Sequence, residues 1–344
     1  MRIDASAYTP ITKFDGNLKK VEFLKYDVTS FAYHLSNFPD VLIIGPGGGR
    51  DVLTALIFGS RKIIGVEINS IITNDIMKER FKKYSGNLYS LDNVEIIVDD
   101  ARNYIRNSKR KYDIIQASLV DTWAATNAGA YSLSENNLYT VEAMAEYINH
   151  LTGNGYLTTS RWHGVNSYKL TVLYLKAAEK LAIKNAGRHI VLIKTGKIVN
   201  HIFKKSEFKE AEIKKISQLA DKMKFEILYM PYFKKENKYT QLINSKDLDK
   251  FIDTYSILYL KASTDDSPFF FNKIQFKSVP SVLLGMTQDI GIFLLYGLFI
   301  ISSFLSLILI AVPLYLNKKD LFKKEAKSKF LYLIYFLCWE LLSC

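Results

Sequence analysis

The sequence is poor in the residues that build disulfides, thiolate sites and many metal sites. Its 344 residues include two cysteines, Cys338 and Cys344, and both lie in the last apolar segment. The rest of the chain therefore has no cysteine for a disulfide, a nucleophilic thiolate or a thiolate metal ligand. The five histidines show no short ligand spacing, so we predict that the protein binds no metal. They are His34, His150, His163, His189 and His201.

The sequence also lacks a concentrated basic stripe, although its formal net charge is +12. The lysines are scattered, and their densest run, residues 318–329, has six lysines and two acidic residues between two apolar segments. Proteins that bind nucleic acids gather basic residues on one face or along one helix. We therefore predict no nucleic-acid partner and interpret the run as a basic patch beside a membrane.

Charge is missing altogether from 27 consecutive residues, 290–316. As a helix this run would extend roughly 40 Å, more than the roughly 30 Å hydrocarbon core of a bilayer. We predict a transmembrane helix over residues 288–316, with a lipid bilayer as partner. A second apolar run, residues 330–344, ends after 15 residues and is too short to span. Since no signal-peptide pattern follows Met1, we expect a piece of a longer, multi-pass membrane protein that ends inside its second transmembrane helix.

A glycine-dense turn stands between an apolar run and a helical pattern, and it reads Val41-Leu-Ile-Ile-Gly-Pro-Gly-Gly-Gly-Arg-Asp51. Because glycine has no Cβ, the backbone can turn sharply and a ligand can approach the N–H groups at the start of the helix. Glu67 follows Gly45 by 22 residues, at the end of the next apolar run, where its carboxylate can accept both hydroxyls of a ribose. The layout predicts a nucleoside site, and the alternative is a tight turn without a ligand. The glycines of this site are Gly45, Gly47, Gly48 and Gly49.

Strand and helix patterns alternate after residue 37. The strand candidates are 41–44, 63–68, 94–98, 113–117 and 156–161, and the helical patterns between them lie near 51–58, 70–84, 101–108 and 140–151. This alternation predicts an α/β fold with a Rossmann-like, methyltransferase-type doubly wound sheet, whose ligands bind beyond the carboxyl ends of the strands. Two further runs, 189–194 and 197–203, predict an antiparallel edge hairpin. Gly59 and Gly153 stand where helix ends favour a left-handed residue.

Five segments follow from these patterns. We predict a short β-rich N-terminal lead-in over 1–37, a Rossmann-like nucleoside-binding domain over 38–205, an α/β extension over 206–280, and transmembrane segments at 288–316 and 330–344.

The third predicted strand ends in Val98-Asp-Asp-Ala-Arg102. Asp100 can accept a hydrogen bond from an adenine amino group, while Ala101 leaves room for the ring. The alternative is that an aspartate here caps the next helix. We favour the adenine role because the glycine turn and Glu67 precede it.

An acidic residue and several aromatic ones follow the fourth predicted strand. Asp121 can supply charge or take a proton from an amine, and the ring faces of Trp123, Tyr131 and Tyr139 attract a cation. The alternative is a structured loop whose aromatic residues only pack. Further along, Asp265-Asp266 precede Pro268 and three phenylalanines. This segment is either a lid or an anchor at a membrane face, or else a turn followed by interfacial aromatic residues.

Together these motifs resemble the polyamine aminopropyltransferases, the spermidine and spermine synthases. The shared motifs are Gly45-Pro-Gly-Gly-Gly, Val66-Glu67-Ile68, Asp100-Ala101-Arg102, Asp121 and Tyr33-His34. The chain is more similar still to the membrane-fused branch of that family, over about residues 5–316. The motifs for that branch are Phe14-Asp-Gly16, Leu119-Val-Asp-Thr-Trp-Ala-Ala125, Glu135-Asn-Asn-Leu-Tyr139, Asp265-Asp266 and Pro268-Phe-Phe-Phe271.

The resemblance implies a transferase that moves an aminopropyl group from decarboxylated S-adenosylmethionine to an amine. Gly45 to Gly49 would cradle the methionine-derived part of the donor, Glu67 its ribose and Asp100 its adenine. Asp121 matches the second acid of the family's Asp-x-x-Asp element and would be the catalytic base or the amine anchor. The other residues assigned to the substrate amine are Trp123, Tyr131, Glu135 and Asp266.

The chain departs from the family pattern at three positions. Ser118 replaces the first acid, which is the family's catalytic base, and we count it with the donor site. Gly48 replaces the aspartate that holds the donor's free amine, and Leu35 replaces the acid after Tyr-His. Aminopropyl transfer needs a base for an ammonium with a pKa of about 10.4. Asp121 could serve, helped by Glu135 or Asp266.

Asp51 could cover the carboxylate missing at Gly48. Arg50 raises an alternative, because a cation beside the loop would suit intact S-adenosylmethionine and hence methyl transfer. A third hypothesis is a non-catalytic membrane protein that binds a nucleoside or polyamine, which fits Ser118 and Leu35. The excess of lysine in residues 318–329 would place that loop in the cytoplasm, and a single intervening span would then place the domain outside. S-adenosyl donors are cytoplasmic, so we expect a membrane protein with a cytoplasmic catalytic domain, and we leave a homo-oligomer open.

Overall fold

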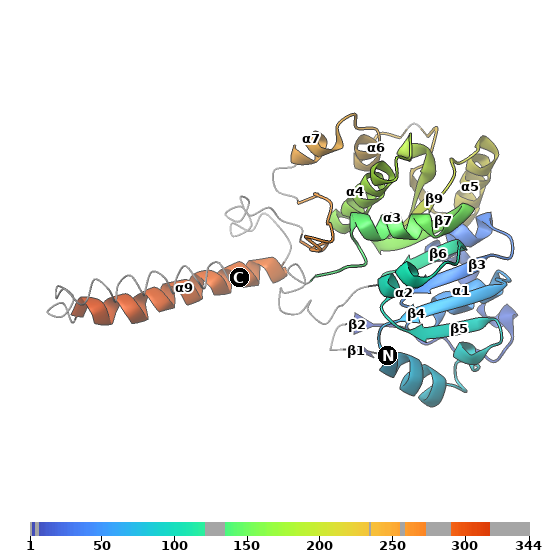
Figure 1. Ribbon diagram of the computed structural model, residues 1–344, viewed down its shortest axis with the longest axis horizontal. Helices are drawn as coiled ribbons and strands as arrows, with labels where there is room; N and C mark the ends of the chain where they lie inside the picture. Colours follow the sequence, from blue (N-terminus) through green and yellow to red (C-terminus); the bar gives the residue numbers. More distant parts are fainter. Residues whose placement is uncertain are drawn as a thin grey trace. The chain divides into compact units, whose positions relative to one another are not determined.

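The structure is a computed structural model that describes residues 2–3, 7–120, 135–233, 235–254, 259–272 and 290–316 (Figure 1). Met1–Pro280 forms one compact unit and Ser281–Cys344 a second. The predicted lead-in, Rossmann-like domain and extension are therefore parts of one compact unit.

The first unit is built on an eight-stranded sheet of order β10-β8-β9-β7-β6-β3-β4-β5. Its strands are β3 (Asp40–Ile44), β4 (Lys62–Glu67), β5 (Val94–Val98), β6 (Tyr112–Ser118), β7 (Leu151–Trp162), β8 (Ile190–Thr195), β9 (Ile198–Lys204) and β10 (Glu226–Tyr229). Strands β3 to β7 pair in parallel, whereas β8, β9 and β10 add antiparallel pairs. The predicted doubly wound sheet and its hairpin are confirmed, and β10 lies outside the hairpin at the edge.

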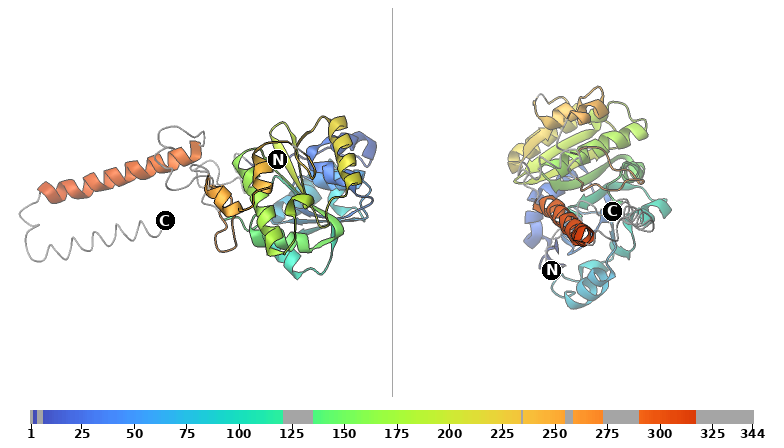
Figure 2. Two further views of the ribbon diagram at one scale, coloured as in Figure 1. Left: turned by 90° about the horizontal axis from the view of Figure 1, so that it is seen from above. Right: turned by 90° about the vertical axis from the view of Figure 1, so that its left-hand side faces the viewer.

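Helices cover both faces of this sheet (Figures 1 and 2). The α-helices are α1 (Arg50–Ile57), α2 (Ala101–Asn107), α3 (Val141–Asn149), α4 (Val165–Lys180), α5 (Glu210–Met223), α6 (Lys238–Ile243) and α7 (Leu248–Asp253). The 3-10 helices are η1 (Leu18–Tyr26), η2 (Val28–Leu35), η4 (Leu88–Ser90) and η7 (Ala186–His189), and η3 (Ile72–Arg80) is a π-helix.

Alternate side chains of the strands enter two separate cores. Leu42 and Ile44 of β3 pack with α2, α3 and α4 on one face. Val41 and Ile43 pack with η1, η2, α1 and α5 on the other face. Because both faces are covered, the parallel strands are apolar on both sides, which is why they read as continuous apolar runs in the sequence.

The N-terminal lead-in differs from the β-rich prediction. Two short strands, β1 (Arg2–Ile3) and β2 (Ala7–Tyr8), pair with each other, and η1 and η2 then fill residues 18–35. Asn17 and Asp27 start these two helices, since their side chains accept hydrogen bonds from the backbone N–H groups of Lys19 and Thr29. The prediction of a β-rich segment is therefore wrong for residues 18–35.

Strand β7 begins earlier than expected. Gly153, predicted at a helix end, lies inside β7 instead. The helix before it ends at Asn149, and β7 pairs with β6 from Leu151 onward across a register shift. Gly59 does adopt the left-handed conformation, with φ of 72°, after α1.

The three phenylalanines after Pro268 do not form an exposed interfacial group. Phe270 and Phe271 are fully buried, and both rings pack against Tyr139. The guanidinium of Arg161 lies 4.0 Å from the centroid of the Tyr139 ring, on the same cluster. The alternative of interfacial aromatic residues is therefore wrong for these two, whose burial holds residues 268–272 in the core of the first unit.

In the second unit the structure describes one helix, α9 (Ile290–Leu316), which contains Pro313. Among the residues that the structure describes, no helix combines the length and apolar character that a membrane crossing requires. The structure thus gives no support to the predicted transmembrane helix at 288–316, and the segment at 330–344 lies outside the described residues.

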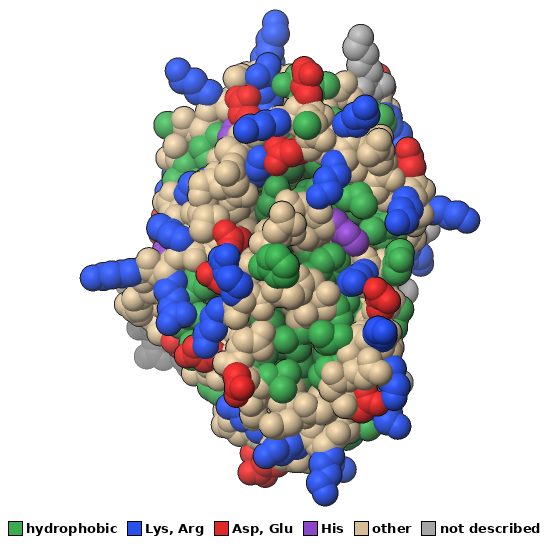
Figure 3. Space-filling view, turned by 90° about the vertical axis from the view of Figure 1, so that its right-hand side faces the viewer, with side chains coloured by type: hydrophobic (Ala, Val, Ile, Leu, Met, Phe, Trp, Pro, Cys, Tyr) green, Lys and Arg blue, Asp and Glu red, His purple; other side chains and the backbone are tan. Residues whose placement is uncertain are grey.

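Basic side chains are spread widely over the face of the molecule in Figure 3, with acidic side chains between them. On that face the lysines and arginines do not form one stripe, which agrees with their scatter along the sequence.

Candidate functional site

The glycine turn lies where the sheet reverses its strand order. From β3 the chain moves outward through β4 and β5 on one side, and β6 and β7 follow on the other. Ligands of such sheets bind beyond the carboxyl ends of the strands at this reversal. Gly45, Gly47 and Gly49 have φ values of 67°, 51° and 82°, which any residue with a Cβ would adopt only under strain. The turn therefore holds the loop close to the carboxyl end of β3.

Glu67 reaches back from the end of β4 to this loop. One carboxylate oxygen accepts the backbone N–H of Gly47 at 3.1 Å, and the other accepts that of Asn69 at 3.0 Å. The side chain is 6% exposed, and burial raises the pKa of Glu67 in spite of these hydrogen bonds. On the far side of the loop the Tyr89 hydroxyl donates to the Gly47 carbonyl at 2.6 Å. The loop is thus held from both sides.

Residues from the N-terminus cover the glycine loop. The Gly48 N–H donates to the Thr9 hydroxyl oxygen at 2.9 Å. A Cβ at position 48 would lie 2.1 Å from the carbonyl oxygen of Pro10. This contact gives a physical reason for the family departure at Gly48, because an aspartate side chain has no room there.

We expect Gly48→Ala to lower the free energy of unfolding by about 1–3 kcal/mol, since a rigid backbone carbonyl must move to admit the methyl group. Gly153→Ala is the matched control, because a Cβ there meets nothing within 4 Å. We expect the control to change stability by less than about 0.5 kcal/mol. Urea unfolding measures both, and equal changes in the two variants would contradict the packing of residues 9 and 10 on the loop.

Asp51 and Ser118 meet across the two central strands. Asp51 lies in the first turn of α1 and is 8% exposed, and Ser118 is the last residue of β6. Burial raises the pKa of Asp51 to about 7; the neighbouring Ser118 side chain opposes the rise, and the charge of Asp27 adds to it. The predicted donor-site residues Asp51 and Ser118 are therefore brought together beside the glycine loop.

Arg50 does not stand free beside that loop. Its guanidinium forms an ion pair with Asp27, the residue that caps η2. This pair removes the specific support for a donor that carries a carboxylate, because the cation already has a partner of its own.

The predicted adenine residues lie at the start of α2. Asp100 accepts the backbone N–H of Asn103 at 3.0 Å and so caps the helix, which was the alternative to the adenine role. Ala101 is buried. At the neighbouring strand ends, Ile68 and Val98 are 71% and 43% exposed although both are apolar. Apolar side chains are therefore exposed at the ends of β4 and β5, and the sequence marked these two residues only as members of the motifs around Glu67 and Asp100.

Several predicted amine-site residues cannot be placed. Asp121, Trp123 and Tyr131 lie outside the described residues. Glu135 and Asp266 lie within the described residues, and both are exposed. The neighbour of Asp266, Asp265, binds Arg102 instead.

Tyr139 does not offer a free ring face to an amine. It is buried under Arg161, and its hydroxyl donates to the Val120 carbonyl at 2.9 Å. The ring face of Tyr139, predicted to attract a substrate cation, is thus occupied by the guanidinium of Arg161.

The sequence predicted no role for Gln116, and it marked Tyr33 only as part of the Tyr33-His34 motif. Gln116 is fully buried in the middle of the apolar strand β6, and its side-chain oxygen accepts a hydrogen bond from the Tyr33 hydroxyl. A glutamine between isoleucine and alanine in a buried strand was the signal, because buried polar side chains need partners. Thr9 and Tyr89 gave no such signal, since their contacts span 39 and 42 residues.

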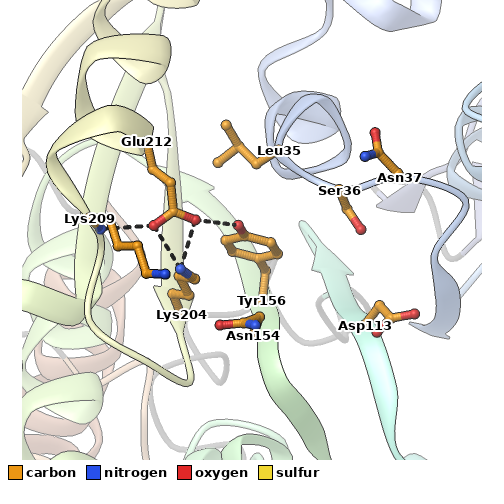
Figure 4. A pocket seen from close by; sticks show the side chains of 9 residues that line it. All are labelled: Leu35, Ser36, Asn37, Asp113, Asn154, Tyr156, Lys204, Lys209 and Glu212. Carbon is orange, nitrogen blue, oxygen red and sulfur yellow. Dashed lines mark hydrogen bonds and ion pairs between the residues drawn. The ribbon is translucent and has the colours of Figure 1, made fainter.

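A separate hollow of about 350 Å³ opens at the amino ends of β6 and β7, away from the glycine loop (Figure 4). Leu35, the position where the family has an acid, lines it together with Asp113. Two of the carboxylates in it are paired: Glu212 contacts Lys204 at 2.7 Å through both oxygens, and Asp113 contacts Arg61 at 3.2 Å. This hollow is therefore not the predicted site. Within the described ranges, no group of three or more His, Cys, Asp or Glu side chains is arranged to hold a metal ion.

Curated proteins match this chain over part of its length. A polyamine aminopropyltransferase of Buchnera aphidicola subsp. Acyrthosiphon pisum (strain Tuc7) is 29% identical over 118 residues, covering 33% of this chain and 37% of that protein. One of Thermoplasma volcanium is 26% identical over 118 residues, covering 33% of this chain and 42% of that protein. The matches take in less than half of each relative's own length. No protein-family profile matches the chain.

Solved structures with a similar chain trace include a spermidine synthase from Thermotoga maritima. It is 15% identical with a TM-score of 0.41, over 77% of this chain and 76% of its own. A spermidine synthase in complex with the transition-state analogue AdoDATO is 16% identical with a TM-score of 0.41, over 79% of this chain and 75% of its own. Membership of the membrane-fused branch stays a prediction. The resemblance to the polyamine aminopropyltransferases is confirmed by sequence similarity over 33% of the chain.

Proposed function

We propose that the protein is an S-adenosyl-dependent transferase that moves an aminopropyl group from decarboxylated S-adenosylmethionine to an amine. The observation that carries this proposal is the similarity over 118 residues to proteins named polyamine aminopropyltransferase. The glycine loop, Glu67 and Asp100 support it, because they lie at the carboxyl ends of neighbouring strands β3, β4 and β5.

The donor's nucleoside fits the chemistry at these strand ends. Glu67 uses two of the about four lone-pair positions of a carboxylate on backbone N–H groups, so capacity remains for both ribose hydroxyls. Ile68 and Val98 offer exposed apolar surface for a purine ring. Asp100 follows Val98 by two residues, and Val98 pairs across the strands with Glu67, the residue before Ile68. The donor's sulfonium end then faces the glycine loop, Asp51 and Ser118.

A product assay tests the proposed reaction. The protein is incubated with decarboxylated or intact S-adenosylmethionine and a panel of amines that includes putrescine, cadaverine and spermidine. Methylthioadenosine formed from the decarboxylated donor supports the proposal. S-adenosylhomocysteine formed from the intact donor would replace it with methyl transfer, and donor binding without either product would replace it with a non-catalytic binding protein.

We expect Glu67→Gln to weaken donor binding by at least about tenfold. The amide keeps the shape of the side chain but can accept on one side only, so either Gly47 or Asn69 loses its acceptor. A buried N–H without a partner costs about 1–3 kcal/mol, and this cost destabilises the loop conformation that binds the donor. Calorimetric titration with decarboxylated S-adenosylmethionine measures the change. Glu95→Gln, an exposed carboxylate of β5, is the control, and equal affinity in the Glu67 variant would contradict the ribose assignment.

Attachment to a membrane, with the catalytic domain on the cytoplasmic side, is a further part of the proposal. The uncharged run of 27 residues supports the attachment, and in α9 the apolar side chains of Leu298, Phe304 and Leu309 are exposed. Flotation of the chain with phospholipid vesicles tests the attachment, and a chain that stays at the bottom of the gradient would contradict it.

A further inference from the structure

We propose that Ser118 and Asp51 act together as the proton acceptor for the amine substrate, with the Ser118 hydroxyl touching the ammonium group and the Asp51 carboxylate receiving the proton behind it. This inference rests on the proposed aminopropyl transfer and assigns a step within it. It differs from the sequence-based assignment of Asp51 to the donor's amine.

The position of the pair matches the place where the reacting atoms must lie. Ser118 ends β6, and Asp51 opens α1 directly after the glycine loop at the end of β3. These two strands are neighbours at the reversal of the strand order, which is where such sheets bind their ligands. Ser118 is partly exposed whereas Asp51 is 8% exposed, so a ligand reaches the hydroxyl first.

A directional chain of hydrogen bonds sets the role of the Ser118 hydroxyl. The carbonyl of Thr29 can only accept, so the group of Gln116 that faces it at 3.3 Å is the NH₂. The same NH₂ donates to the Ser118 oxygen at 2.9 Å. The Ser118 hydroxyl proton is thereby not used on Gln116 and is available to the neighbouring Asp51 carboxylate, whose pKa Ser118 lowers. The Gln116 oxygen accepts from Tyr33 and fixes the amide in this orientation.

The charges around Asp51 suit a group that gains and loses a proton near neutral pH. Burial is the main cause that raises its pKa to about 7; the charge of Asp27 adds to the rise, and Ser118 and Arg50 oppose it. Tyr33 and Tyr89 also face it, and burial keeps the pKa of both phenols well above 10. They therefore stay neutral. A base works best when its pKa lies near the operating pH.

The proposed step balances. The substrate ammonium gives one proton to the Ser118 oxygen as the Ser118 hydroxyl proton passes to Asp51, which leaves a neutral amine and a protonated carboxyl. The amine nitrogen then attacks the donor's methylene carbon next to the sulfonium. A carbon–nitrogen bond forms, the carbon–sulfur bond breaks with its electron pair going to sulfur, and methylthioadenosine leaves. Asp51 returns its proton to water.

The test compares the pH dependence of turnover in the full chain and in three variants. For the wild type we expect kcat, measured as methylthioadenosine formed from putrescine and other amines, to rise with pH through about 7. Asp51→Asn should lower kcat by about 10²- to 10⁴-fold and remove that rise, while the Kd of the decarboxylated donor changes less than about threefold. Ser118→Ala should lower kcat as well, and Ser118→Thr, which keeps a hydroxyl, should retain it.

Each other result counts against the inference. An Asp51→Asn enzyme with unchanged kcat and an unchanged pH profile overturns it and leaves the proposed function standing. A Kd for the donor raised by more than about tenfold with kcat retained instead assigns Asp51 to the donor's amine. A wild type that forms no methylthioadenosine with any amine overturns the proposed function and this inference together. Asp253→Asn, an exposed position of α7, is the control for the substitution itself.

Discussion

Replacing Asp51 by asparagine should make the protein more stable above pH 7. Burial raises the pKa of this carboxyl from its ordinary 3.8 to about 7. The folded protein therefore holds the proton more tightly than the unfolded chain, so stability falls as the pH rises from about 4 to about 7. At about 1.36 kcal/mol for each pH unit, the cost above pH 7 is about 4 kcal/mol. Asparagine carries no charge and avoids this cost.

Urea unfolding at pH 4 and pH 8 measures the effect. At pH 4 the two proteins should have nearly the same free energy of unfolding, because most of the Asp51 carboxyl is protonated in the folded wild type. At pH 8 the variant should be more stable by up to about 4 kcal/mol, whereas Asp253→Asn should match the wild type at both values. A variant that is less stable than the wild type at pH 8 would show that Asp51 is not a strained buried charge. A more stable variant with lower turnover also excludes unfolding as the cause of lost activity.

The central sheet could be predicted because its strands carry their own signal. β5 spans the predicted residues 94–98; β3 differs from prediction by one residue at its start, and β4 and β6 differ by one residue at each end. These strands are buried on both faces, so their apolar runs are continuous and the polar turns mark their ends. Strand β7 was predicted five residues too short at its start. Its first residues, Thr-Gly-Asn-Gly after Leu151, favour a turn locally, but pairing with β6 across a register shift overrides them.

The helices of residues 18–35 were missed for the opposite reason. The segment is rich in β-branched and aromatic residues such as Val21, Phe31 and Tyr33, which favour strands. Packing of η1 and η2 against α1 and the sheet decides the structure instead. Asn17 and Asp27 were the available signals, because each caps a helix.

The candidate site likewise has one part that the sequence predicts and one part that it does not. Glu67 and the glycine loop were found because their spacing reflects one strand–helix–strand unit. The pairing of Asp51 with Ser118 joins positions 67 residues apart in the sequence, and no local pattern reports it. The cover of Thr9 and Pro10 over the loop is equally non-local. Spacing therefore identified the nucleoside end of the site, while the proton-accepting end required the topology of the sheet.

The motif Asp100-Ala101-Arg102 and the motif Asp265-Asp266 are joined by an ion network that should carry a large share of the stability. Arg102 is 6% exposed, and its guanidinium contacts Asp265 at 2.6 Å and Glu146 at 3.1 Å. Thr140 donates a further hydrogen bond to Asp265. The neighbouring Arg106 contacts the same two carboxylates but is 52% exposed. The network fixes the segment before Pro268 to α2 and α3.

We expect Arg102→Met to lower the free energy of unfolding by about 3 kcal/mol at pH 7, because it leaves two partly buried carboxylates without their main partner. Arg106→Met, the matched control, should cost less than about 1 kcal/mol, since its pairs are screened by water. The hydrogen bond from Arg102 lowers the pKa of Asp265 to about 2, so the wild type should lose this stabilisation as the pH falls from about 4 to about 2. The Arg102 variant should lack that acid loss. Urea unfolding of the three proteins between pH 2 and pH 7 measures it, and equal losses for the two arginines would mean that the pair is no stronger than a surface ion pair.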